Sequence, residues 1–188
     1  GSLLGHSQHG HMEAVGYETY VKLLNQAIAE EKGEAVAADK ADCLIDITVD
    51  AYIPEDYIPD AAGRIEAYKR IAAIENKDDA SDVLDELIDR YGDVPPSVMG
   101  LVDISLTRVA AAALGVYEIT QRGETLLLYS DHLDMAHLGP VLKALGRRVL
   151  VNASAKPYLS VKIEAGEKPV DVMRMALDRL DAGGHEEG

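Results

Sequence analysis

The apolar residues of the N-terminal third follow first a helical and then an extended pattern. A repeat near 3.6 residues predicts a helix that ends near Gly33, with residues 34–41 as a linker; its apolar positions are Val15, Tyr17, Tyr20, Val21, Leu24 and Ile28. Residues 43–51 instead alternate apolar and polar side chains, which predicts a strand with one mostly polar face. Pro54 is expected to end that strand.

Three helices are predicted next. Asp60 is a good N-cap for the first, whose inward residues are expected to be Ile65, Tyr68, Ile71 and Ala72. Asp78 or Asp79 is expected to cap the second, which carries an apolar stripe of Val83, Leu84, Leu87, Ile88 and Tyr91 and ends at Gly92. Pro95-Pro96 opens the third, and Gly115 ends it.

The remainder of the chain predicts two strand–strand–helix units. Residues 116–120 and 125–130 form one strand pair around a turn at Arg122-Gly123, and residues 148–152 and 157–163 form the other. One helix is predicted at about 134–145, and a second helix is predicted to begin at Pro169. Because most strands follow one another through short connections, antiparallel pairing is favoured. The predicted class is α+β, with an N-terminal connector helix preceding the rest.

Composition narrows the range of functions. The 188 residues carry 33 acids against 18 bases, a formal net charge of −15. This charge disfavours nucleic acid as the main ligand and favours a basic protein surface, although acid excess also serves solubility alone. Cys43 is the single cysteine, and no apolar run is long enough for a bilayer span, so we expect a cytoplasmic location and no membrane partner.

Signatures of catalysis are weak. The sequence lacks a serine nucleophile elbow, a GxxxxGK[ST] phosphate loop, a GxGxxG motif and an HExxH motif. His6, His9 and His11 lie close together on a glycine-rich stretch, but no cysteine or fixed fourth ligand accompanies them, so we predict no metal site. A free-standing enzyme of unknown class and a nucleic-acid-binding module with a basic stripe stay open as alternatives.

The stretch "IPEDYIPDAAGRIEAYKRIA", residues 53–72, is interpreted mainly as a corner that builds the fold. Its prolines, Pro54 and Pro59, fix the path of the chain, and Asp60 caps the helix. Tyr68 is expected to pack in the core. Arg64 and Lys69 are expected to flank the apolar stripe and to pair with acids of the following helix.

These residues resemble the C-terminal region of the bacterial transcription-repair coupling factor family, Mfd. The family shows an Ile/Leu-Pro-x-x-Tyr/Phe-Ile-x-Asp turn, here Pro54, Tyr57, Pro59 and Asp60, before a helix with an arginine and a Tyr-Lys-Arg run. It continues with an acidic helix ending in Asp-Arg-Phe/Tyr-Gly, matched by "LIDRYGDVPPSV" with Asp89, Arg90 and Gly92. Upstream, "LLGHSQHGHMEAVGYETYVKLL" is similar to the end of the translocation motif shared with the RecG translocase.

The resemblance implies an organisation of the chain. Residues 1–34 would be the end of the translocase motif and a connector helix, with residues 35–41 as a linker. Residues 42–182 would form a C-terminal regulatory domain, in which 42–115 are the family core and 116–182 the strand–strand–helix pair. Residues 183–188 are expected to be a disordered tail. Gln8 and Gly10 match the translocation motif, while His9 replaces its usual serine.

The resemblance also implies a function. The full-length protein would be an ATP-driven translocase on double-stranded DNA, using ATP and magnesium outside this chain, that displaces stalled RNA polymerase and recruits UvrA for nucleotide excision repair. Its C-terminal domain would restrain the motor and mask the UvrA-binding surface of an N-terminal UvrB-like module, with no catalysis and no cofactor of its own. Charge placement selects the acids that would meet arginines of that module: Asp56, Asp82, Asp85, Glu86 and Asp89.

Overall fold

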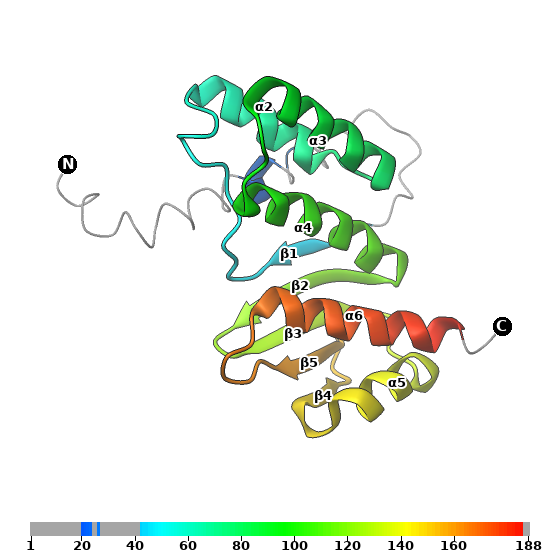
Figure 1. Cartoon of the computed structure of the whole chain (residues 1–188). Coiled ribbons are helices and arrows are strands. Elements are labelled where there is room, and N and C mark those ends of the chain that lie inside the picture. The colour runs from blue at the N-terminus through cyan, green and yellow to red at the C-terminus, as the bar shows by residue number, and fades with distance from the viewer. Residues whose placement is uncertain (1–19, 24–25, 27–41, 186–188) are drawn as a thin grey trace. The chain divides into compact units, whose positions relative to one another are not determined.

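The structure is a computed structural model in which residues 20–23, 26 and 42–185 are described (Figure 1). The chain forms two compact units. The first comprises residues 1–40 and 49–106, and the second comprises residues 41–48 and 107–188. This division differs from the boundaries expected from the sequence, because residues 41–48 join the second unit and the change between units falls within a helix. The predicted connector helix, linker and translocation motif lie mostly or wholly outside the described residues.

Helices dominate the first unit: α2 (Ala61–Ala72), α3 (Lys77–Tyr91) and the first part of α4 (Pro96–Ala113). Asp60 caps α2 as predicted, since its side chain accepts a hydrogen bond from the backbone N–H of Gly63 at 3.0 Å. Gly92 ends α3 with a positive φ of 88°, which favours glycine. The core is made of apolar side chains from these helices and from the extended segment before them: Ile53, Ile58, Tyr68, Ile71, Ile74, Val83, Leu87, Val98, Leu101 and Ile104.

Three predictions about α2 and α3 are wrong. The N-cap of α3 is Asn76, whose side chain accepts from the backbone N–H of Asp79 at 2.8 Å. The Asp79 carboxylate instead accepts from the N–H of Glu75, so it stabilises the turn before the helix. Ile65 and Ile88, expected to face inward, are 46% and 49% exposed because they lie at the margins of their stripes.

The second unit contains a five-stranded sheet in the order β1-β2-β3-β5-β4. Its strands are β1 (Leu44–Asp46), β2 (Val116–Arg122), β3 (Thr125–Ser130), β4 (Val149–Asn152) and β5 (Tyr158–Lys162). The α-helices of this unit are α5 (Met135–Leu145) and α6 (Pro169–His185), and a short 3-10 helix, η2 (Gly146–Arg148), leads from α5 into β4. The expected mixed α+β class, with its two strand–strand–helix units, is therefore confirmed.

The strand β1 departs from the expected antiparallel arrangement. It pairs in parallel with β2, with Ile45 opposite Ile119. It is also only three residues long, although the predicted strand covers residues 43–51. The burial pattern still alternates beyond both ends of β1, since Cys43, Ile47 and Ala51 are buried while the residues next to them are more exposed. The period-two pattern therefore predicted which side chains are buried but not how far the hydrogen-bonded ladder extends.

One face of the sheet forms the core of the second unit. Positions that the register aligns on this face are fully buried: Ile119, Leu126, Leu128, Leu159 and Val161. The helices α5 and α6 pack together, with α6 lying across the sheet (Figure 1). Residues 183–185, which we expected to belong to a disordered tail, form the end of α6, so that expectation is wrong for these residues.

Candidate protein-docking surface

The corner before α2 is fixed by backbone hydrogen bonds. The N–H groups of Tyr57 and Ile58 both donate to the carbonyl of Pro54 at 3.1 Å, which closes a tight turn. The Arg64 guanidinium then donates to the carbonyls of Ile58 at 2.8 Å and Pro59 at 3.0 Å. Arg64 therefore holds the entry to its own helix and does not pair with acids of α3 as we expected, because these carbonyls lie within reach of its first turn.

Two tyrosines join this corner to its surroundings. The hydroxyl of Tyr68 accepts a hydrogen bond from the buried N–H of Ile53 at 2.9 Å, and burial raises the pKa of Tyr68. The hydroxyl of Tyr57 donates to the carbonyls of Leu87 at 3.3 Å and Gly92 at 3.0 Å. Burial, with a smaller contribution from the charge of Asp93, raises the pKa of Tyr57 as well. The corner is thus tied to the C-terminal end of α3.

The exposed side of α3 carries a row of carboxylates. Asp78, Asp82, Asp85 and Asp89 are all exposed, and their spacing of four, three and four residues places them along one side of the helix. We call these four residues the acidic face. Within the part of the chain that the structure describes, none of them forms an ion pair. Like charges held this close repel one another, so a cationic partner would relieve the repulsion.

Glu86 differs from its neighbours. Its carboxylate is paired with Arg70 of α2 and lies 3.5 Å from the guanidinium of Arg90. It is therefore already neutralised inside the unit and does not belong to the acidic face. This pairing could not be predicted from the sequence, because it depends on which residues of α2 face α3. Asp56 is exposed on the corner, beside Tyr57 and hence at the C-terminal end of α3.

A shallow groove lies between α2 and α3, which run side by side (Figure 1). Ala67, Val83 and Leu87 line it with apolar atoms, and the ion-paired Arg70 and Glu86 stand at its margin. An apolar groove next to charged groups suits a protruding side chain of a protein partner.

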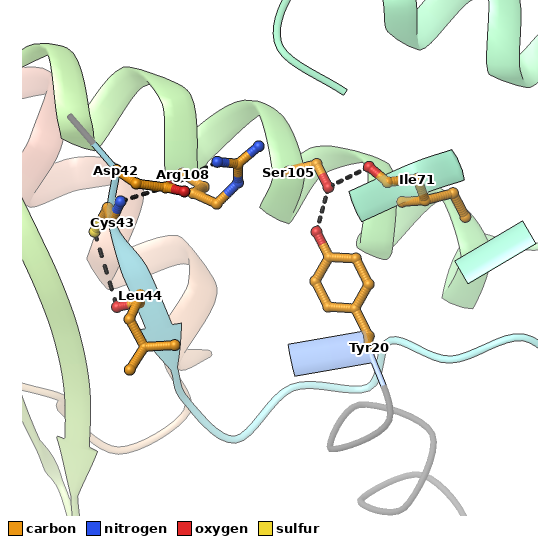
Figure 2. A network of polar contacts seen from close by, with 7 residues as sticks. All are labelled: Tyr20, Asp42, Cys43, Leu44, Ile71, Ser105 and Arg108. Carbon is orange, nitrogen blue, oxygen red and sulfur yellow. Dashed lines mark hydrogen bonds and ion pairs between the residues drawn. The ribbon is translucent and has the colours of Figure 1, made fainter. Parts of the chain in front are cut away.

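Buried polar groups hold the middle of α4 (Figure 2). In the first unit, the fully buried Ser105 donates its hydroxyl hydrogen to the carbonyl of Ile71 at 2.8 Å and contacts the hydroxyl of Tyr20. In the second unit, Arg108 forms an ion pair with Asp42 at 2.6 Å. The sequence pattern indicated no partner for either Ser105 or Arg108.

The other candidate chemistry is not assembled into a site in the described residues. The translocation-motif residues Gln8 and Gly10, and the three N-terminal histidines, lie outside them. Among residues 20–23, 26 and 42–185, no cluster of histidine, cysteine and carboxylate side chains is suited to a metal ion. No helix in that part of the chain has the length and apolar character of a membrane span. Cys43 is fully buried, and burial raises the pKa of its thiol strongly, which disfavours the reactive thiolate.

Comparison with known proteins connects this fold to one family. The family model described as the TRCF domain matches residues 47–137. The transcription-repair-coupling factor of Staphylococcus epidermidis is 37% identical over 127 residues, which are 67% of this chain and 11% of that protein. That of Staphylococcus aureus is 32% identical over 157 residues, 80% of this chain and 13% of that protein. The chain thus spans about a tenth of the length of these relatives.

A solved structure has a similar fold. The crystal structure of a C-terminal domain of transcription-repair coupling factor matches with a TM-score of 0.65 at 20% sequence identity. The match covers 79% of this chain and 98% of the solved one. The resemblance seen in the sequence is therefore confirmed: residues 47–137 are a TRCF domain, and the chain is a relative of transcription-repair-coupling factors that shares the fold of their C-terminal domain.

Proposed function

We propose that this chain is a regulatory docking domain of a transcription-repair-coupling factor and performs no catalysis itself. In this proposal the domain binds the UvrB-like N-terminal module of the same protein, masks the surface that recruits UvrA, and restrains the translocase until RNA polymerase is engaged. The family match supports the assignment to this kind of factor. The acidic face of α3 is the observation that carries the docking role.

The acidic face suits an association that must be reversible. Carboxylates that are exposed in the free domain lose little solvation until a partner arrives, and they attract a basic surface over a distance of about 10 Å at moderate ionic strength. The groove between α2 and α3 adds an apolar pocket beside the charges. Such a combination gives specificity and fast association more than high affinity, as a masking domain requires.

Tethering would compensate for a weak contact. When both modules belong to one polypeptide, docking is intramolecular, and its effective concentration can reach the millimolar range. A competing partner that binds either docked surface would then release the domain, because the two binding events are coupled. ATP and magnesium belong, in this proposal, to other parts of the full-length protein, since the present sequence has no phosphate-binding GxxxxGK[ST] loop.

Calorimetric titration of this chain into the isolated UvrB-like module of the same protein tests the proposal. We expect binding at low salt that weakens steadily as sodium chloride is added. Charge reversal at Asp82, Asp85 and Asp89 together should weaken it at least tenfold. A matched reversal of three exposed acids of the second unit (Glu124, Asp131 and Asp178) should change the affinity less than threefold.

Two results would reject the docking role. One is the absence of any complex at low salt, with millimolar concentrations of the module. The other is equal weakening by the two triple variants, which would mean that net charge acts rather than the acidic face. An ATP-hydrolysis assay of the chain alone tests the second part of the proposal, and turnover above the buffer blank would contradict it.

A further inference from the structure

One segment of this acidic protein contains no acidic residue. Residues 143–163 hold five bases and neither aspartate nor glutamate, in a chain that has 33 acids in 188 residues. The segment begins at the end of α5 and continues through η2, β4 and β5. It therefore concentrates positive charge at one end of the sheet of the second unit.

That end of the sheet has an unpaired edge. In the described part of the chain β4 pairs only with β5, so its other side has no neighbouring strand. Every second residue of such an edge directs its amide N–H and its carbonyl outward, which makes the edge a template for an added strand. β4 contains no proline and no charged side chain, the devices that commonly protect an edge strand.

Two apolar side chains are exposed on the same strand. Leu150 is 70% exposed and Val151 is 42% exposed. They point to opposite faces of the sheet because side chains alternate along a strand. A strand added beside β4 would cover both laterally, and its own alternate side chains would lie next to them.

The charges around β4 complete the site. Lys143, Arg147 and Lys162 are exposed, and none of them takes part in an ion pair with another described residue. Arg148 is different, because it is paired with Glu167 and lies 3.5 Å from Glu164. The first three lie on elements that adjoin β4, namely α5, η2 and β5, and their charges are available to carboxylates of a partner.

We propose that the β4 edge binds an extended, acidic peptide segment of a partner protein by strand addition. Main-chain hydrogen bonds along β4 give the affinity, Leu150 and Val151 receive apolar side chains, and the three bases select carboxylates. A nucleic-acid backbone matches the charge but makes no use of the edge amides or the apolar pair. A second copy of β4 matches the edge but would bring like charges together. The proposal uses residues that the docking role of α3 does not use.

Fluorescence polarisation with labelled synthetic peptides tests this site on the complete 188-residue chain. The probe is a ten-residue peptide alternating glutamate with valine and threonine. One comparison peptide has lysine for glutamate, and another has two central prolines, which remove amide donors without changing the charge. We expect binding of the acidic peptide, at least tenfold weaker binding of the proline peptide, and no binding of the lysine peptide.

Variants of the protein locate the site. Leu150→Asp places a carboxylate at the edge and should weaken binding of the acidic peptide at least tenfold. Its control is Ile65→Asp, which makes the same change at an exposed isoleucine of α2 and should leave affinity within twofold. Arg147→Glu should weaken binding about fivefold, whereas Arg122→Glu, at the turn between β2 and β3, should not. Amide NMR shifts on titration should be largest at residues 149–152.

The outcomes are distinct. Equal affinity for the acidic and proline peptides, or equal effects of Leu150→Asp and Ile65→Asp, would overturn strand addition. Binding of a single-stranded oligonucleotide that displaces the peptide and is insensitive to Leu150→Asp would replace it with a nucleic-acid site. A dimeric mass by light scattering that Leu150→Asp reverses would show a second copy as the occupant. Failure of any peptide to bind at millimolar concentration would also reject the proposal.

Discussion

Gly183 and Gly184 are adjacent in α6 but should respond oppositely to the same substitution. A Cβ atom on Gly183 would lie 2.6 Å from the carbonyl oxygen of Ala136 and 2.7 Å from the Cα of His137, both in the backbone of α5. A Cβ on Gly184 would meet only the side chain of His137, at 3.4 Å. Gly183 therefore permits the close contact between α5 and α6, while Gly184 does not contribute to it.

The magnitudes follow from these distances. Ordinary contact needs at least 3.4 Å, so Gly183→Ala would force the two helices apart by roughly 0.8 Å. Overpacking of this kind costs about 1–3 kcal/mol, and backbone atoms that cannot change rotamer put the cost near the upper end. Alanine recovers up to about 1 kcal/mol of helix propensity at either position. We expect Gly183→Ala to lower the free energy of unfolding by about 2 kcal/mol and Gly184→Ala to raise it slightly.

Urea unfolding followed by circular dichroism measures both variants against the parent chain, with unchanged m-values as the check that the same transition is compared. In Gly183→Ala, the backbone amides of α5 and α6 should exchange hydrogen faster than in the parent chain, because the loss of stability is local to these two helices. If Gly183→Ala matched Gly184→Ala in stability, the close approach of the two helices would be disproved. If both lost stability equally, a general requirement for glycine at this end of α6 would explain the result instead.

Three other perturbations follow from buried or capping groups. Tyr68→Phe leaves the buried N–H of Ile53 without its acceptor, so urea unfolding should show a loss of about 1–3 kcal/mol. Because the folded-state pKa of Tyr68 is raised, its stabilisation is complete below about pH 10 and is lost above it; Tyr68→Phe should show a smaller loss on alkaline titration. Cys43 should react with a thiol reagent at least about a hundredfold faster in urea than in the native state, and rapid native reaction would contradict its burial. Asp60→Ala should cost about 1 kcal/mol through the lost cap on Gly63, and Asp60→Asn should retain most of that stability.

The sequence predicted elements well where the determining signal is local. Asp60 caps α2 and Pro169 begins α6, both as expected, and the helix expected at about 134–145 is α5. Each of these signals acts within about one helical turn. The prediction of the N-cap of α3 was wrong because Asn76, Asp78 and Asp79 all have side-chain oxygens that can accept a hydrogen bond within four residues. Only the position of the first helical turn selects among them.

The sequence pattern did not predict features that depend on residues far apart in the chain. β1 pairs with a strand that follows it by about seventy residues, and nothing in its alternation specifies a parallel neighbour. The C-terminal glycines were interpreted as a disordered tail, whereas Gly183 is required by the approach of another helix. In the candidate docking surface, exposure of Asp82, Asp85 and Asp89 followed from the apolar stripe on the opposite side of α3, while the pairing of Glu86 with Arg70 depended on how α2 and α3 meet.

The two units differ in charge, although the net charge of the whole chain does not show it, and this difference determines which partners each surface can bind. By sequence, the first unit has 8 bases and 20 acids, while the second has 10 bases and 13 acids. The acidic face of α3 and the basic surroundings of β4 would both bind more weakly in salt, so salt dependence alone cannot tell them apart. The sign of the partner can: a basic module should be sensitive to reversal of the aspartates on α3, and an acidic peptide to substitution of Leu150 or Arg147. The net charge of −15 therefore argues against anionic partners for the surface of α3, but it does not argue against them for the β4 edge.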